Sequence, residues 1–380
     1  MGDQNPGVSA LDDEIDLGEI IDFLAGEWRR LLLAATMAMA LAVGGAVLFG
    51  GYTVTGLIIN SSPSKSDATF DFVKWKYFQK ALPDLASELV HGKRVQPDVE
   101  EQFKRMARPE WWDKNVVPVF ALSKNDSKLL GSVSKELQDS SGTLIQYLAV
   151  DGSGRTKEAA EKNLATSVEF IRSGSAYLAL KGLIANIDVT TARAEADIRK
   201  QILAAEVEMK YLEQKSRNLE LLRKRFPGTS AGASTGGQVL DPKDAGAKYL
   251  PLDTQLIAVN AAIYSLGESL ERLRNTQIKH AAMRAFVDLA ASAVAQINDG
   301  PVLGTELLRI VAGLRKESQP DDLIRQEALT GLESSLGAIV TAFDKGLQTS
   351  VEPQARRNAK FSLLGALGFL GGGLAMLIYI

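Results

Sequence analysis

The sequence predicts an α+β membrane protein, in which two transmembrane helices flank an α/β base that carries a long antiparallel helical hairpin. The first observation is a pair of uncharged apolar runs, Leu31–Gly51 and Phe361–Ile380. Each has about the 20 residues that a membrane-crossing helix needs. The second is a helical pattern without Gly or Pro over 190–225. The third is a set of short, β-branched apolar segments on both sides of that pattern.

Residues 1–30 form an acidic tail with an amphipathic lead-in. Residues 1–27 hold eight acidic side chains and no Lys or Arg. Five apolar side chains then fall on one face of a helix: Leu17, Ile20, Ile21, Leu24 and Trp28. A helix lying on a membrane surface is favoured over one that docks on a partner, because amphipathic helices commonly lie in the interface.

The run 31–51 is interpreted as an uncleaved anchor rather than a cleaved signal, because it is longer than a secretory h-region and follows an acidic tail. Arg29 and Arg30 precede it, which favours a cytoplasmic N-terminus. Basic residues also precede the second span on the domain side, and alone they favour a cytoplasmic domain: Arg356, Arg357 and Lys360. The first helix usually sets the topology, so we expect the domain outside the cytoplasm.

Small side chains recur at helical spacing in both runs. They are Ala34, Ala38, Ala42, Ala46 and Gly50 in the first, and Gly365, Gly368 and Gly372 in the second. Such spacing lets helix backbones approach closely in lipid. We therefore expect transmembrane packing through these faces, within or between chains; the alternative is the general abundance of Gly and Ala in membrane helices.

The first part of the base, 52–154, is expected to begin with a strand at Tyr52–Ile59. Two helices and two strands should follow, at Asp71–Leu89, Val99–Met106, Val116–Leu122 and Thr143–Val150. A turn is expected at Asp151–Gly154. For the adjacent Trp111 and Trp112, core packing is favoured over a sugar-stacking platform, because buried aromatic rings dominate core energetics.

Residues 155–300 predict the helical hairpin. The first helix should run to Phe226, with Ser173–Ser175 as the expected weak point or kink. A flexible loop is expected near 228–250, and a second helix over Pro251–Ile297 should return antiparallel to the first. A rod this thin cannot bury both faces by itself, so neighbouring copies are expected to contribute.

The second part of the base, 301–360, follows the segment Asn298–Pro301 (Asn-Asp-Gly-Pro), which is interpreted as a helix stop. Two shorter helices, Thr305–Lys316 and Asp321–Leu336, and a closing strand at Ala338–Phe343 are expected before the second span, 361–380.

The composition and motifs exclude several classes of function. A net charge of −3 argues against a nucleic-acid partner, because duplex binders concentrate basic surface. The lack of cysteine rules out disulfides, thiolate metal sites and Cys nucleophiles. Neither His91 nor His280 has a partner at metal-ligand spacing, and Gly92–Arg94 (Gly-Lys-Arg) is only a partial match to a phosphate loop. We therefore expect no enzyme, and no catalytic, cofactor-binding or metal-binding residues.

The N-terminal segment resembles a known family. Asp13–Leu17 (Asp-Glu-Ile-Asp-Leu), the amphipathic lead-in and Trp28–Arg30 (Trp-Arg-Arg) before the first span are similar to the N-terminus of the chain-length-determinant (Wzz-type) polysaccharide co-polymerases. The order of predicted elements resembles that family over nearly the whole chain. The resemblance implies a multi-pass protein of the inner membrane of a Gram-negative bacterium, with its domain in the periplasm, assembled as a ring-shaped homo-oligomer.

The resemblance also implies a role in setting the chain length of O-antigen or a similar surface polysaccharide. The partners that it implies are a Wzy-type polymerase, undecaprenyl-diphosphate-linked glycan and membrane lipid. Arg356, Arg357 and Lys360 are candidate contacts for the lipid diphosphate or for headgroups, with ordinary interfacial anchoring as the favoured alternative. A family branch that carries a tyrosine autokinase is disfavoured, because the phosphate loop is missing.

The main hypothesis is therefore a non-enzymatic regulator of polysaccharide chain length. One alternative is a periplasmic adaptor for capsule or exopolysaccharide export, which would share the hairpin. An alternative of another class is a transmembrane sensor, which is disfavoured because the 27-residue acidic tail is too small to be an output domain.

Overall fold

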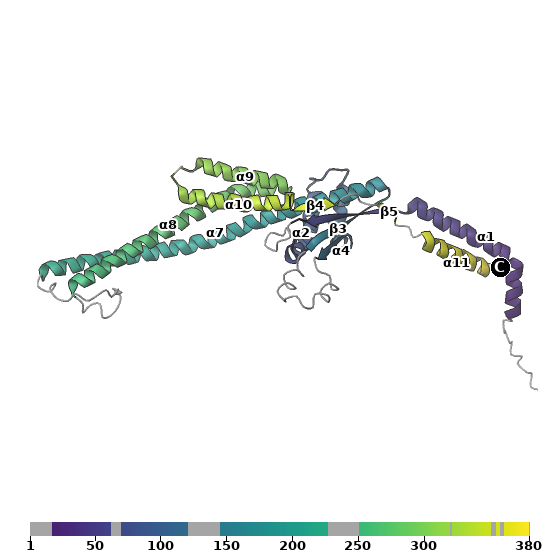
Figure 1. The fold of residues 1–380 in the computed structure, drawn as a ribbon, viewed down its shortest axis with the longest axis horizontal. Helices are drawn as coiled ribbons and strands as arrows, with labels where there is room; N and C mark the ends of the chain where they lie inside the picture. Colours follow the sequence, from purple (N-terminus) through teal and green to yellow (C-terminus); the bar gives the residue numbers. More distant parts are fainter. Residues whose placement is uncertain are drawn as a thin grey trace, which may run out of the picture.

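The computed structural model describes residues 17–61, 70–120, 145–226, 251–319, 321–350, 355–357 and 361–379. The molecule is elongated, with a small sheet and its covering helices in the middle (Figure 1). A two-helix hairpin extends to one side of the sheet, and two terminal helices lie on the other.

The sheet is antiparallel throughout its described strands. These are β1 (Tyr52–Asn60), β2 (Val116–Phe120), β3 (Ile145–Gly154), β4 (Leu347–Ser350) and β5 (Ala355–Arg357). The strand order is β2–β3–β1–β4, and β5 also pairs with β1. In that pairing Arg357 lies opposite Tyr52, the first residue of β1. The chain therefore enters and leaves the sheet at the same end.

The predicted first strand is confirmed by β1, but the predicted turn at Asp151–Gly154 is wrong, because β3 continues through it. These glycines lie beneath helix α7 (Lys157–Arg225). A Cβ on Gly152 would lie 2.6 Å from the Cβ of Leu164. The glycines are therefore explained by the close approach of a helix backbone, and not by a change of chain direction.

Three helices cover the sheet beside α7: α2 (Phe72–His91), α3 (Glu100–Met106) and α4 (Pro109–Asn115). The tryptophans Trp75 and Trp112 are fully buried in the core between them. The indole N–H of Trp112 donates a 2.6 Å hydrogen bond to the carbonyl of Met106. Core packing is therefore confirmed for Trp112, and Trp111 packs edge-on against it at a centroid distance of 5.2 Å.

The hairpin consists of α7 and α8 (Leu252–Gln296). At 1.5 Å per residue, the 69 residues of α7 span about 100 Å. The weak point predicted at Ser173–Ser175 is wrong, because α7 runs through it as regular helix and all three residues are buried. A Cβ on Gly174 would lie only 2.8 Å from Leu82 of α2, so small residues here permit close helix packing. The loop expected near 228–250 lies outside the described residues.

The outer half of the hairpin is held by a narrow seam. Leu212, Leu219 and Val259 form a small buried cluster between α7 and α8. An ion pair between Arg223 and Asp253, 2.9 Å apart, lies beside this seam. Its side chains are exposed, so it contributes at most about 1 kcal/mol. Most of the surface of this half therefore remains without a packing partner in the described chain.

The helices α9 (Gly300–Glu317) and α10 (Leu323–Asp344) form a second pair, which lies along the inner half of the hairpin (Figure 1). The strand predicted at Ala338–Phe343 is wrong, because these residues belong to α10. Leu336 and Phe343 are both buried. Their spacing of seven residues places them on one helical face, so a helical period was mistaken for a short apolar strand.

The terminal helices α1 (Leu17–Phe49) and α11 (Phe361–Tyr379) pack against one another. No helix in the described ranges combines the length and the hydropathy that membrane crossing needs. The predicted pair of transmembrane helices is therefore wrong, and with it the membrane-protein fold class and the multi-pass inner-membrane location with a periplasmic domain.

The physical reason for the wrong transmembrane prediction lies in the composition of the two apolar runs. They were recognised by their lack of charged side chains. However, ten of the 21 residues in 31–51 are Ala or Gly, and five of the 20 residues in 361–380 are Gly. Ala and Gly lower the hydropathy of a run relative to one made of Leu, Ile, Val or Phe, and the described parts of α1 and α11 do not meet the combined requirement of length and hydropathy.

Candidate functional site

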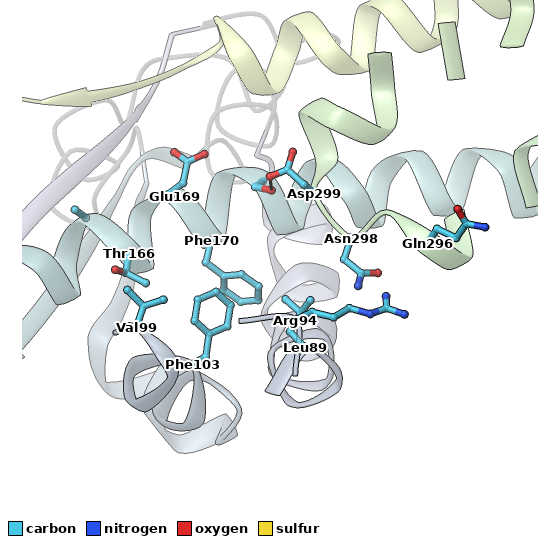
Figure 2. Close-up of a pocket in the computed structure, with 12 residues that line it drawn as sticks. Leu89, Arg94, Val99, Phe103, Thr166, Glu169, Phe170, Gln296, Asn298 and Asp299 are labelled. Carbon is cyan, nitrogen blue, oxygen red and sulfur yellow. Dashed lines mark hydrogen bonds between the residues drawn. The ribbon is translucent and has the colours of Figure 1, made fainter. Parts of the chain in front are cut away.

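A cavity of about 730 Å³ lies where four parts of the fold meet. They are the C-terminal end of α2, helix α3 with the residue before it, the N-terminal part of α7 and the connection from α8 to α9 (Figure 2). The volume falls within the roughly 300–1,000 Å³ typical of ligand pockets. The cavity is the candidate functional site.

Arg94 is placed at the cavity by the way in which α2 ends. The N–H groups of Lys93 and Arg94 donate to the carbonyls of Val90 and Leu89, at 3.1 and 3.0 Å. This Schellman pattern requires a left-handed residue after the helix cap, and Lys93 adopts it with φ 51°. Glycine is the usual residue there, so the turn that presents Arg94 is formed at a cost in backbone energy.

One wall of the cavity is aromatic and aliphatic. Phe103 of α3 and Phe170 of α7 contact edge to face, with ring centroids 4.9 Å apart. Trp112 stands behind Phe170 at 6.2 Å and joins this wall to the core of the base. Because Phe170 is buried and packed on two sides, the wall is a fixed part of the fold.

The α8–α9 connection is bound to α7 by a small hydrogen-bond network. Ser173 donates to the carboxylate of Asp299 at 2.9 Å and accepts from the N–H of Gly300 at 3.2 Å. The other carboxylate oxygen of Asp299 accepts from Val302 N–H at 3.0 Å and caps α9. The network holds the neighbouring Asn298, whose side chain points toward Arg94 in Figure 2.

Two carboxylates line the cavity, and each already has partners. Both oxygens of Asp299 accept the bonds described above. Glu169 lies 3.7 Å from Arg172 and points away from the phenylalanine rings (Figure 2). Within the described ranges, no three His, Asp or Glu side chains gather in a way that could hold a metal ion.

The small residues predicted to pack are brought together within one chain. A Cβ on Gly368 would lie 2.8 Å from the Cβ of Ala42 and 3.0 Å from the carbonyl oxygen of Ala38. A Cβ on Gly372 would lie 3.0 Å from the carbonyl oxygen of Ala34. The backbones of α1 and α11 therefore approach closely along this face.

The remaining small residues lie near the ends of the two helices that adjoin the sheet in the chain. Gly365 faces Met39, and a Cβ on it would lie 3.3 Å from the methionine methyl group. Ala46 lies in the last turn of α1, and Gly50 follows the end of that helix at Phe49.

The predicted diphosphate contacts lie at the edge of the sheet. Arg356 and Arg357 belong to β5 and are exposed. The Arg357 guanidinium lies over the ring of Tyr52, 5.5 Å from its centroid. Lys360 lies outside the described residues. A role of these residues in binding a lipid diphosphate stays a prediction.

The cavity residues were not found by reasoning from the sequence. Gly92–Arg94 was considered only as an incomplete phosphate loop, and Asn298–Pro301 only as a helix stop. The two segments are about 200 residues apart, and no local pattern links them. The available signal was the Arg directly after a helix end that lacks glycine at the left-handed position.

No family model matches the sequence, and no curated protein matches it either. Among solved structures, the chain is similar to a full-length bacterial polysaccharide co-polymerase at 15% sequence identity. The alignment covers 95% of this chain and 94% of that chain, with a TM-score of 0.41. A TM-score this low does not establish a common fold, so the functional proposal rests on the sequence and geometry of this chain.

Proposed function

We propose that this chain is a non-catalytic regulator of surface-polysaccharide length, for O-antigen or a similar polymer. Copies of the chain form an oligomeric co-polymerase, which works with a Wzy-type polymerase on undecaprenyl-diphosphate-linked glycan. The N-terminal resemblance to the co-polymerase family over residues 12–52 supports this proposal.

The observation that carries the proposal is the position of the chain ends relative to the hairpin. Pairing of β1 with β5 brings both terminal helices to one end of the sheet, and the hairpin extends from the other (Figure 1). A helix of about 100 Å, whose N-terminal part packs on the base and whose remainder extends beyond it, suits a protein that holds other components at a fixed separation.

Exposed apolar side chains on the hairpin support assembly of several copies. Leu203, Val207 and Tyr211 follow one another at four-residue spacing on α7 and are 63%, 61% and 56% exposed. This spacing places them on one face of the helix. A contiguous apolar stripe on a two-helix rod lacks the partner surface that would remove it from water. A second copy of the hairpin supplies such a surface.

Deletion of the gene in its host tests the function. We expect the regulated length distribution of one surface polysaccharide to become broad, and a copy of the wild-type gene to restore it. The measurement is the length ladder of O-antigen, capsule and exopolysaccharide on gels. An unchanged ladder for all three polymers would refute the proposal, and loss of export without a change in length would favour an export adaptor.

A hairpin variant tests the assembly. Leu203→Glu combined with Val207→Glu places two charges on the apolar stripe without touching the core, so the chain should fold but no longer assemble. Light scattering of the purified particle should show a lower mass, and the length ladder should lose its regulation. Gln201→Glu is the control, because it adds a charge to an exposed position on another face of α7. Full mass in the double variant would refute assembly through this stripe.

A further inference from the structure

The cavity beside α7 contains a buried hydrogen-bond donor that has no acceptor in the described chain. The side-chain nitrogen of Asn298 is buried from solvent and has no hydrogen-bond partner. A buried donor without an acceptor costs about 1–3 kcal/mol, so native structures rarely leave one unsatisfied. The Arg94 guanidinium lines the same cavity, and the residue is exposed, so this donor is accessible to a ligand from solvent.

These hydrogen-bond donors favour an anionic ligand over a cationic one, although two carboxylates also line the cavity. The carboxylate of Asp299 accepts one hydrogen bond on each oxygen, from Ser173 and from the N-terminus of α9, and Glu169 is turned toward Arg172. The donors concerned are the positive Arg94 and the amide N–H of Asn298, and the neutral side chains of Thr166 and Gln296 line the cavity beside them. Arginine presents several N–H donors in a plane and binds carboxylates through two parallel hydrogen bonds.

The opposite wall favours a ring with apolar faces over a small inorganic anion. Phe103 and Phe170 offer aromatic surface, and Leu89 and Val99 extend it with aliphatic side chains. Figure 2 shows these rings on one side of the site and the pair Asn298 and Arg94 on the other. A ligand that satisfies both sides therefore carries hydrocarbon surface on one side and a negative charge on the other.

We propose that this cavity binds an acidic sugar unit, with its carboxylate on Arg94 and Asn298 and the C–H face of its ring on Phe103 and Phe170. The volume of about 730 Å³ admits more than one sugar ring, so the unit can belong to a longer glycan. The inference rests on the proposed function, since it names the class of polysaccharide that the regulator contacts.

The site is rigid before the ligand arrives. Ser173 ties the α8–α9 connection to α7, and the Schellman turn holds the backbone at Arg94. Binding therefore orders little additional chain, and more of the interaction free energy remains as affinity.

Binding of acidic and neutral oligosaccharides to the purified full-length chain tests the proposal. The probes are trimers of galacturonate, mannuronate and sialic acid, each paired with its own methyl ester, which lacks the negative charge. Titration calorimetry measures affinity, and tryptophan fluorescence provides a second signal because Trp112 contacts the cavity wall. We expect at least one acidic trimer to bind with a Kd below about 1 mM, and its ester at least tenfold more weakly.

Three variants locate the site. Arg94→Ala removes the cation, and Asn298→Asp replaces the amide donor by a carboxylate of nearly the same shape. Each should weaken the acidic trimer at least tenfold, because a hydrogen bond to a charged group contributes about that factor or more. Arg108→Ala is the matched control, since it removes the same charge from an exposed position outside the cavity. Its affinity should equal that of the wild type.

Several outcomes would overturn the proposal. They are binding of no acidic trimer, equal binding of acid and ester, or full affinity in Arg94→Ala. Loss of assembled mass in Arg94→Ala, without a change in affinity, would instead assign the arginine to a contact between copies and also overturn it.

The experiments distinguish a failure of the sugar-binding proposal from a failure of the proposed function. If gene deletion changes the length ladder but no acidic trimer binds, the regulator proposal stands and the sugar site fails. If an acidic trimer binds in the cavity but deletion leaves every ladder unchanged, the site stands and the regulator proposal fails.

Discussion

Gly152→Ala is expected to destabilise the base of the molecule, because α7 crosses β3 at van der Waals distance. A Cβ at this position would lie 2.6 Å from three atoms: the carbonyl oxygen of Ala160, and the backbone nitrogen and Cβ of Leu164. Ordinary contacts lie at about 3.5–4.0 Å, so the helix must retreat by about 1 Å. Two of the three atoms belong to the helix backbone, which cannot rotate out of the way.

The expected loss of stability in Gly152→Ala follows from two opposing effects, overpacking in the folded state and lower entropy in the unfolded state. A gap of 0.5–1 Å forfeits a quarter to a half of the dispersion energy at a contact, and overpacking of this kind costs about 1–3 kcal/mol. Alanine also lowers the conformational entropy of the unfolded chain, which stabilises the folded state by about 0.4–1 kcal/mol. Since backbone atoms are involved, we expect the upper part of the first range and a net loss of about 2 kcal/mol.

Gly56→Ala is the matched comparison, because Gly56 lies in the neighbouring strand β1 and faces the same leucine. The three atoms nearest to its added Cβ would all be side-chain atoms of Leu164, the first at 3.0 Å. A leucine side chain can change rotamer, so the two terms should nearly cancel and leave the stability within about 1 kcal/mol of wild type.

Urea unfolding followed by tryptophan fluorescence measures both variants. Three of the four tryptophans lie in the base, at Trp75, Trp111 and Trp112, so the signal reports on the region that the substitutions change. Equal unfolding midpoints for Gly152→Ala and Gly56→Ala would refute the argument that helix backbone, rather than the Leu164 side chain, restricts this position.

Three further predictions concern single contacts. Lys93→Gly should raise stability by up to about 1 kcal/mol in urea unfolding, because glycine adopts the left-handed conformation without the Cβ clash; an unchanged or lower midpoint would contradict it. Asp299→Ala should lower the free energy of unfolding more than Asp322→Ala does. Both substitutions remove a helix cap worth about 0.5–2 kcal/mol, but only Asp299 also accepts a hydrogen bond from α7. Equal losses of stability would show that the bond to α7 does not stabilise the fold. The hydrogen bond from Lys162 lowers the pKa of Asp98 in the folded chain. Its contribution to folding stability is therefore present above the pKa that Asp98 has in the unfolded chain, and it is lost as the pH falls through the lower pKa of the folded chain. Lys162→Met should raise the pKa of Asp98 in an NMR titration.

Local patterns were sufficient for the long helices and for the first strand. Residues 190–225 lack Gly and Pro, and apolar side chains recur every three or four positions, so a helix is the only regular structure that buries them together. The strand at Tyr52–Ile59 is β-branched and apolar, and β1 has almost the same bounds. In both cases the decisive information lies within one segment of the chain.

Local patterns gave wrong predictions where a residue is small because a distant element packs against it. The glycines of Asp151–Gly154 indicated a turn, and Ser173–Ser175 indicated a kink, yet both segments are regular structure. Their residues are small because α7 crosses the sheet at the first segment and meets α2 and α9 at the second. Sequence alone cannot distinguish a small residue that bends the chain from one that lets another element approach.

The hairpin and the candidate site show the same difference between local and long-range information. The sequence by itself determined that two long helices pair as a hairpin, because helical period and helix-breaking residues are local properties. Only the tertiary structure decided that Arg94, Phe170 and Asn298 line one cavity, since that depends on where α8 returns to α7. It also decided that the uncharged terminal runs pair with each other, because helix packing depends on the shape of opposing faces and not on the absence of charge.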